Sequence, residues 1–480
     1  VFKIMPDGTG YSKLLDCTGA ANGRRPYGLL ISDSAFLYGM TVQGGTNDLG
    51  VVFKIMPDGT GYTKLLDFAG ASNGSHPYGS LVSDGTFLYG MTRDGGTNNL
   101  GVIFKIMLDG TGYSKLLDFA GSNGSDPTGS LISDGTFLYG MTSQGGTNNY
   151  GVVFKIMPDG TGYTKLLDFA GTANGRQPMG SLVSDSTYLY GMTNLGGTNN
   201  LGVIFKIMPN GTGYSKLLDF TGAANGCLPY GSLVSDGAFL YGMTAFGGVS
   251  DRGVIFKIMP DGTGYSEFFD FAYDANGNVP FGSLISDGLF LYGMTAYGGT
   301  NDAGTAFRYC LTMPTVNLVL NPDTVCINTS AYALSGGLPT GGTYSGAGVI
   351  LGNFDPNAAG AGLHNIIYTY ADTNNCSNSD TAQLVVDVCT ANHTASANQT
   401  FSIFPNPSKG IFTLVFAGET KQSKIEIYNV LGEKVIQIVF PNGSGNLEID
   451  LSDRPDGIYF LQIKTEQGEE FESKKLIINK

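Results

Sequence analysis

The residue types that most often carry catalysis are sparse in this sequence. The 480 residues include three histidines, His76, His364 and His393, and these lie in different regions of the chain. A histidine-based metal site or a Ser-His-Asp triad needs such groups close together, so we expect neither. The sequence also lacks HExxH, GxSxG and P-loop motifs. We therefore expect a protein that is not an enzyme and that holds no metal and no cofactor.

Aspartates recur at fixed positions, and two kinds of chemistry could use them. Asp33 and its equivalents lie in Ser-Asp-Gly or Ser-Asp-Ser turns, where a carboxylate can bond backbone amides. A ring of such groups could bind calcium, but no loop places several oxygen ligands at suitable spacing. Paired carboxylates could also meet across repeats, as in propeller glycosidases, which leaves a polysaccharide hydrolase or lyase as an alternative.

Two short segments differ between repeats that are otherwise nearly identical. One is the residue pair before Gly-Gly, and the other is the pair after Asn-Gly. A fixed scaffold with variable loops is how repeat proteins build recognition surfaces, although neutral drift in exposed loops is the alternative. The candidate ligand-binding residues are Arg24, Arg25, His76, Arg93, Asp94, Gln144, Arg176, Gln177, Phe246 and Tyr297.

These residues belong to a repeat of about 51 residues. Phenylalanines of a Val-Phe-Lys-Ile-like motif, counting Ala-Phe-Arg-Tyr-Cys at 306–310, recur at spacings of 51, 51, 50, 51, 51 and 51. Each unit contains four short runs rich in β-branched and aromatic residues, such as GSLVSD, TFLYGMT, GVIFKIM and YSKLLDF, separated by Asp-Gly, Gly-Gly or Asn-Asn turns. Four strands in about 50 residues are typical of one propeller blade.

The predicted fold class is therefore all-β: a β-propeller of about six four-stranded blades over residues 1–309, followed by two small β-sandwich domains. In a closed ring the N-terminal strand would complete the last blade, and an open solenoid is the alternative. The chain begins mid-blade at Val1 with neither Met nor signal peptide, which suggests that an upstream part is missing. Because antiparallel strands alternate in direction, both variable segments should lie on one face of the ring.

Charge and hydropathy exclude some classes of binding partner. The net charge of -14 and a pI near 4.6, with no Lys/Arg cluster, argue against nucleic acid or an anionic membrane. No apolar run reaches the 18 or so residues of a membrane helix, so we expect no transmembrane segment. An extracellular glycan or protein is the expected ligand.

Four cysteines bracket the second predicted domain, residues 310–390. An even number of cysteines in a small domain suggests disulfides and an oxidising location. Among three connectivities we favour Cys326–Cys376 and Cys310–Cys389. Residues 391–400 form a predicted linker, and residues 401–480 contain alternating runs that predict another sandwich.

Each part of the chain also resembles a known family. The motif LYGMTxxGGTNNxGVVFKI resembles the GloVer tandem repeat of bacterial surface proteins, for which propellers are predicted. The string LSGGLPTGGTYSGAGV resembles immunoglobulin-like modules of the Bacteroidetes. PNPSKG, IYNVLGEKV, GIYFLQI and the terminal KLIINK together resemble the C-terminal sorting domain of type IX secretion cargo. That last resemblance implies a partner, the type IX machinery, which would engage residues 401–480.

The sequence thus predicts a secreted or cell-surface protein of a Gram-negative bacterium. Its expected function is binding or adhesion through the variable loop face of the propeller. The alternatives are a polysaccharide hydrolase or lyase and a purely structural surface or matrix component.

Overall fold

The computed structural model describes residues 1–272, 276–389, 401–416, 423–440, 446–465 and 470–480. It divides into two compact units, Val1–Met313 and Pro314–Lys480. The only helix among the described residues, α1 (Pro356–Ala359), is four residues long, so none of them forms a helix able to cross a membrane. The predicted linker 391–400 lies outside the described residues.

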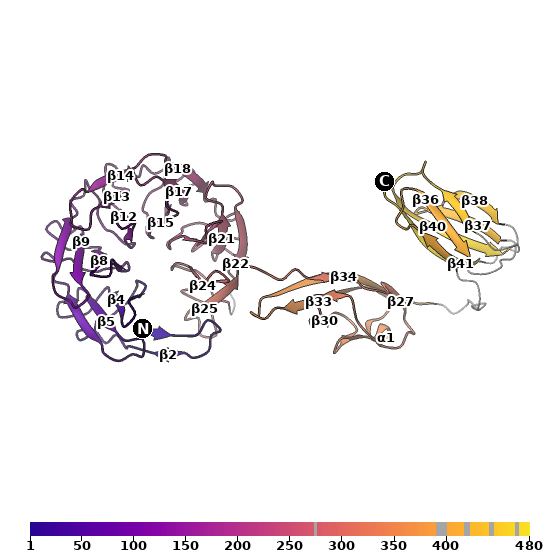
Figure 1. The fold of residues 1–480 in the computed structure, drawn as a ribbon, viewed down its shortest axis with the longest axis horizontal. Coiled ribbons are helices and arrows are strands. Elements are labelled where there is room, and N and C mark those ends of the chain that lie inside the picture. Colours follow the sequence, from indigo (N-terminus) through magenta and orange to yellow (C-terminus); the bar gives the residue numbers. More distant parts are fainter. Residues whose placement is uncertain (273–275, 390–400, 417–422, 441–445, 466–469) are drawn as a thin grey trace. The chain divides into compact units, whose positions relative to one another are not determined.

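The sheets of the first unit are arranged in a ring, as Figure 1 shows, which confirms the predicted all-β, propeller-like fold. Each complete sheet has four antiparallel strands that follow one another in chain order. The five complete sheets are β3 (Ile31–Ser32), β4 (Leu37–Thr41), β5 (Val51–Ile55) and β6 (Thr63–Asp67); β7 (Val82–Ser83), β8 (Phe87–Thr92), β9 (Val102–Met107) and β10 (Ser114–Asp118); β11 (Ile132–Ser133), β12 (Leu138–Thr142), β13 (Val152–Ile156) and β14 (Thr164–Asp168); β15 (Val183–Ser184), β16 (Leu189–Thr193), β17 (Val203–Ile207) and β18 (Ser215–Asp219); and β19 (Val234–Ser235), β20 (Leu240–Met243), β21 (Val254–Ile258) and β22 (Ser266–Asp270).

Two further sheets of the first unit have fewer strands. Among the described residues, β1 (Phe2–Lys3) pairs only with β2 (Ser12–Lys13), whereas β23 (Ile285–Ser286), β24 (Phe290–Met294) and β25 (Ala306–Cys310) form a three-stranded sheet. The N-terminal strand therefore does not complete the last sheet as expected. The reason is that β1 and β25 both hold the third-strand position of the repeat, and β1 pairs with its own fourth strand. Six as the number of blades stays a prediction.

The core of each sheet rests on a phenylalanine lying against a glycine. In the first complete sheet, Gly39 of the second strand is paired with Phe53 of the third. A Cβ built on Gly39 would come within 2.8 Å of the Phe53 ring, so no larger residue fits there without displacing the ring. Phe53 and its equivalents in the other four complete sheets are fully buried.

Neighbouring sheets of the ring are joined by side-chain contacts that repeat around it. A second phenylalanine, which follows the fourth strand, packs edge-on against the core phenylalanine of the next sheet, as Phe68 does on Phe104 with 5.5 Å between ring centroids. The lysine after the core phenylalanine donates a hydrogen bond to a carbonyl of the next repeat, as Lys54 does to Leu108. Arg308 takes the lysine position in β25 and donates to the Pro6 carbonyl, so the last sheet contacts the first in the same way.

The innermost strands are linked by a ladder of serines. The backbone N–H of Ser80 donates to Ser130 Oγ, and the N–H of Ser130 donates to Ser181 Oγ, both at 2.7 Å. The same bond continues through Ser232 and Ser283. Successive repeats therefore approach one another closely at the centre of the ring, immediately after the second variable segment.

The second unit begins with three small sheets around one apolar core. They consist of β26 (Asn317–Leu318) and β29 (Gly337–Leu338); β27 (Thr324–Cys326), β34 (Ser377–Asp387), β33 (Gly362–Ala371) and β30 (Thr343–Ser345); and β28 (Tyr332–Ala333), β32 (Asn353–Phe354) and β31 (Val349–Ile350). Phe354, Ile366, Tyr368 and Leu384 are the most deeply buried members of this core.

The predicted disulfide pairing is wrong. Cys326 forms a disulfide with Cys389, which excludes both Cys326–Cys376 and Cys310–Cys389. The reason is the parallel pairing of β27 with β34, which sets Cys326 beside Asp387, near Cys389. Cys376 precedes the other end of β34, an 11-residue strand of about 36 Å.

The C-terminal residues form two facing sheets. One contains β35 (Phe401–Phe404), β36 (Ile411–Phe416) and β39 (Asn446–Asp450), and the other contains β38 (Lys434–Phe440), β37 (Ser423–Asn429), β40 (Gly457–Thr465) and β41 (Glu470–Ile478). Alternate residues from both sheets, such as Phe412 and Leu461, meet in an apolar core.

One buried charge stands out in this C-terminal sandwich. The Glu426 carboxylate is 6% exposed and accepts hydrogen bonds from Lys464 at 2.7 Å, Lys434 at 2.9 Å and the Tyr428 hydroxyl at 2.7 Å. These three contacts, Lys464 first, lower the pKa of Glu426 to about 2. The network therefore stabilises the sandwich as long as Glu426 is ionised.

We predict that Glu426→Gln destabilises the C-terminal sandwich by about 3 kcal/mol, because two lysines lose their buried partner. Hydrogen exchange of β37 and β40 in the full chain should quicken by roughly 100-fold at pH 7. Since the folded-state pKa of Glu426 is depressed, its contribution is complete above the unfolded value near 4.5 and is lost as the pH falls toward 2. The difference between wild type and variant should therefore shrink over that range, and a pH-independent difference would contradict the charge network.

Candidate binding surface

The two variable segments of each repeat lie side by side. The first residue after Asn-Gly forms an antiparallel bridge with the residue just before Gly-Gly, and the bridge occurs in all six repeats. The bridged pairs are Arg24 with Gln43, Ser75 with Asp94, Ser125 with Gln144, Arg176 with Leu195, Cys227 with Phe246, and Asn278 with Tyr297. The structure thus brings together, within each repeat, the segments that the sequence comparison singled out. We call the twelve-segment surface so formed the variable surface.

Main-chain hydrogen bonds hold the second residue after Asn-Gly in the same way from the second repeat onward. His76 has φ 52°, its N–H donates to the Leu49 carbonyl at 2.9 Å, and its carbonyl accepts from Arg93 N–H at 3.1 Å. Its equivalents also have φ between 54° and 57°: Arg25, Asp126, Gln177, Leu228 and Val279. Because these bonds use main-chain atoms only, the side chain at this position is free to differ from repeat to repeat.

A buried threonine holds the variable segment that precedes Gly-Gly by a hydrogen bond to its main chain. Thr142 Oγ1 donates to the Gln144 carbonyl at 2.8 Å and accepts from the Val152 N–H at 3.2 Å. Thr142 is fully buried, and the same two bonds recur at the equivalent threonines of the other complete sheets. The threonine is constant, so it supports loops whose own side chains vary.

Several candidate residues lie apart from one another on this surface. Arg24 forms an ion pair with Asp48 at 2.6 Å, and Arg176 Nε donates to Asn200 Oδ1 at 3.2 Å. Arg25 and Tyr297 are exposed, and Phe246 is half-buried.

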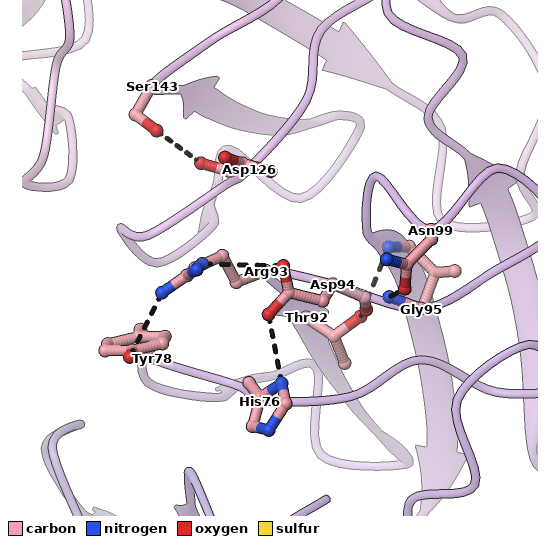
Figure 2. A network of polar contacts seen from close by, with 10 residues as sticks. His76, Tyr78, Thr92, Arg93, Asp94, Gly95, Asn99, Asp126 and Ser143 are labelled. Atoms are coloured by element: carbon pink, nitrogen blue, oxygen red, sulfur yellow. Dashed lines mark hydrogen bonds and ion pairs between the residues drawn. The ribbon is translucent and has the colours of Figure 1, made fainter.

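Another group of candidates forms one polar network, drawn in Figure 2. The Asp94 carboxylate contacts His76 Nδ1 at 3.0 Å and Arg93 Nε at 3.5 Å. The Arg93 guanidinium also donates to the Tyr78 hydroxyl at 3.2 Å and lies 5.4 Å from the centre of that ring. Arg93 is thereby held between a carboxylate and an aromatic ring, with Asp126 and Ser143 of the next repeat across from it.

A cavity of about 310 Å³ opens beside this network. Its walls come from several consecutive repeats and combine one cation, one carboxyl group, amides and hydroxyls with a few apolar groups. The lining residues are Arg93, Asp126, Thr128, Ser143, Gln144, Gln177, Met179, Asn194 and Tyr230. The structure thus brings Arg93, Gln144 and Gln177 together at one cavity.

Two lining groups have unusual environments. Burial raises the pKa of the Asp126 carboxyl, the charge of Asp94 raises it further, and Arg93 offsets part of the rise. Asn194 is 6% exposed, and its Nδ2 has no hydrogen-bond partner among the described residues. A buried amide without a partner costs about 1–3 kcal/mol.

Sequence comparison missed some of the cavity wall. Thr128, Met179 and Tyr230 occupy the middle of a Pro-x-Gly motif that follows the second variable segment. This position also differs between repeats, with Tyr, Thr, Met or Phe, and that variation could have revealed it. Asp126, Ser143 and Asn194 belong to the variable pairs but were not among the residues singled out for binding.

The constant aspartates have structural partners. Asp33 Oδ1 accepts from the N–H groups of Ala35 and Phe36, and Oδ2 accepts from the Tyr38 hydroxyl at 2.7 Å. The Tyr38 bond and the backbone bonds lower the pKa of Asp33. The same turn recurs in each repeat, which accounts for the invariant Ser-Asp motif. The described residues contain no group of three or more His, Cys, Asp or Glu placed to hold a metal ion.

We predict that the threonine and the variable residue above it differ in their effect on stability. Thr142→Val removes the hydroxyl, so the Gln144 carbonyl and the Val152 N–H each lose a hydrogen-bond partner. The change should lower the free energy of unfolding by about 1–2 kcal/mol and quicken amide exchange in β12 and β13 by roughly 5- to 30-fold. Gln144→Ala should leave that exchange unchanged. Equal effects of the two changes would contradict the separation between scaffold and variable surface.

Two known families match parts of the chain. The Gloeobacter/Verrucomicrobia repeat matches residues 1–133, 82–187 and 173–359. The secretion system C-terminal sorting domain matches residues 402–479. The sorting domain indicates secretion through the type IX system and attachment at the cell surface, and it implies interaction with the type IX machinery. No curated protein matches the chain.

The solved structures that match this chain have little sequence in common with it. TolB from Acinetobacter baumannii is 13% identical, with TM-score 0.32, over 54% of this chain and 57% of its own. A puromycin-hydrolyzing peptidase from Mycobacterium tuberculosis is 14% identical, with TM-score 0.44, over 75% and 53%. PorZ, a surface component of the type IX secretion system of Porphyromonas gingivalis, is 12% identical, with TM-score 0.23, over 94% and 75%. The chain spans little more than half the length of the first two.

Proposed function

Since the chain belongs to the Gloeobacter/Verrucomicrobia repeat family and carries a C-terminal sorting domain, we propose that it is a surface-attached protein that binds an extracellular ligand. The proposed binding site is the variable surface, and its best-formed part is the cavity lined by Arg93, Asp126 and Asn194. The single observation that carries the proposal is the buried Asn194 amide, which has no partner among the described residues and borders that cavity.

The chemistry of the cavity favours a glycan over a protein side chain. Its carboxylate and amides can accept and donate several closely spaced hydrogen bonds, which suits the vicinal hydroxyls of a sugar, and Tyr230 offers an apolar ring. Its volume of about 310 Å³ lies at the lower end of the usual range for small-ligand sites.

Charge further favours a neutral glycan. The Arg93 cation is already paired with Asp94, and Asp126 adds a second carboxylate without a cation of its own. The chain as a whole carries a net charge of -14. An acidic sugar would therefore meet repulsion both at long range and within the cavity.

Binding should be found first on an array of neutral and acidic glycans probed with the full chain. For the neutral glycan that binds best, Asn194→Ala should weaken affinity by about 5- to 20-fold in calorimetry, because a direct hydrogen bond to the ligand is lost. Thr164→Ala, an exposed change on the outer strand of a neighbouring sheet, is the matched control and should bind as wild type. Unchanged affinity of Asn194→Ala would place the ligand outside this cavity.

Binding should also depend on pH through Asp126. The raised pKa of Asp126 means that its carboxylate becomes protonated at a higher pH than an ordinary aspartate, so acceptance from sugar hydroxyls weakens as the pH falls through that raised value. Affinity should therefore decrease on acidification in the wild type. Asp126→Asn should flatten this profile, and a parallel decrease in both proteins would assign the pH effect to another group.

The same glycans also discriminate the alternative functions. Release of shorter products would indicate a hydrolase or lyase, with Asp126 as the carboxyl group suited to act as an acid. Absence of both binding and turnover, together with ordered assembly on the cell, would indicate a structural surface component.

A further inference from the structure

The outer edge of β25 differs from the equivalent edge of every complete sheet. In those five sheets the third strand is paired on its outer side with a fourth strand, as β21 is with β22. Within the described residues, β25 is the last strand of a three-stranded sheet. This edge lies on the outer side of the sheet and shares no residue with the variable surface.

The hydrogen-bonding groups of this edge follow from the antiparallel ladder. The Thr305 carbonyl accepts from Thr295 N–H at 2.9 Å, so Thr305 directs its main-chain groups toward the second-strand side of the sheet. Because these directions alternate along an antiparallel strand, the N–H and C=O groups of Ala306 and Arg308 point outward. An added strand would find these groups in the arrangement that the fourth strand uses elsewhere.

A cavity marks the place where the fourth strand would begin. In each complete sheet a tyrosine just before the fourth strand stacks on the core phenylalanine, with ring centroids 5.7–6.1 Å apart. Four of these tyrosines also donate to an asparagine carbonyl of the preceding repeat, as Tyr265 does to Asn225 at 2.9 Å. The corresponding residues in the last repeat are Phe307 and Asn276. Both line a cavity of about 290 Å³.

The loop that anchors the far end of the fourth strand is also retained. In the first complete sheet, Thr46 donates through N–H and Oγ1 to Asp67, and Asn47 Nδ2 donates to the Phe68 carbonyl. The Phe68 N–H in turn donates to the Gly50 carbonyl at 3.1 Å. The last repeat has the same residues in the same order: Thr300, Asn301 and Gly304.

Burial at this edge is incomplete. The core phenylalanines of the five complete sheets are fully buried, whereas Phe307 is only half-buried and Ala306 is exposed. Ala306 stands where the other repeats have Val or Ile, so its smaller side chain leaves the cavity open. Covering this apolar surface would favour strand addition.

The neighbouring sheet does not obstruct the edge. Arg308 contacts Pro6 through the hydrogen bond that Lys54 and Lys206 make in complete sheets. Since those sheets carry a fourth strand at the same time, the contact and the added strand are compatible.

We propose that the outer edge of β25 is an acceptor site for a strand donated by a partner protein. The occupant is an extended segment with the sequence of the repeat's own fourth strand, in which a tyrosine precedes an aspartate by five positions and an aromatic residue follows the aspartate. Its tyrosine fills the cavity on Phe307, its aspartate is bound by Thr300, and its main chain pairs with Ala306 and Arg308.

The test uses a fluorescent peptide with the sequence of residues 212–221, TGYSKLLDFT, and the full chain. Fluorescence anisotropy should show saturable binding of one peptide per chain. The same peptide with alanine at the tyrosine should bind at least 10-fold more weakly, and a scrambled peptide should not bind. Hydrogen exchange should show peptide-dependent protection of β25.

Two variants of the chain test the acceptor. Ala306→Pro removes an outward N–H that β24 does not use, and should abolish binding. Asn301→Ala is an exposed change in the anchoring loop that leaves the sheet intact, and should weaken binding several-fold. If amide exchange in β25 of the free Ala306→Pro variant is faster than in the wild type, its loss of binding is not informative. The test then depends on Asn301→Ala and on the peptide with alanine in place of tyrosine.

Equal affinity for the scrambled peptide, or protection of another strand in place of β25, would overturn the proposal. Self-association of the chain that the peptide reverses would support it, with a second copy as the donor. Neither result bears on glycan binding at the variable surface, because the two sites share no residue.

Discussion

Each repeat depends on the contact between a phenylalanine ring and a glycine on the adjacent strand. Because Gly39 has no side chain, the end of the Phe53 ring can pack against its strand. The phenylalanine after the fourth strand then packs edge-on against the same ring in the next sheet. In the complete sheets these two contacts bury two phenylalanines of each repeat and fix both the sheet and its neighbour.

A scaffold held from within leaves the loops free to vary. The variable residues are joined to the scaffold by main-chain bonds and by a buried threonine, so their side chains carry little of the stability. The cavity at Arg93, Asp126 and Asn194 therefore costs the fold little, apart from the unpartnered amide of Asn194. A buried polar group of this kind can be satisfied by a ligand or by bound water.

Much of the fold could be predicted from the sequence because the same pattern of strands and turns recurs in six repeats. Alternating apolar residues predicted the strands, and the dipeptides Asp-Gly and Gly-Gly predicted the turns between them. The cavity could not be predicted, because its walls come from several repeats whose distance depends on the serine ladder at the centre. The prediction of the disulfide pairing was wrong for a similar reason. The bond follows from the parallel pairing of β27 with β34, and no sequence pattern indicates that pairing.

The most direct test of the account is the structure of the full chain with a bound neutral oligosaccharide. We predict that the sugar lies in the cavity of the variable surface, with one hydroxyl accepting from Asn194 Nδ2 and another donating to the Asp126 carboxylate. A sugar bound on the opposite face, or at the variable surface without contact to either residue, would contradict it.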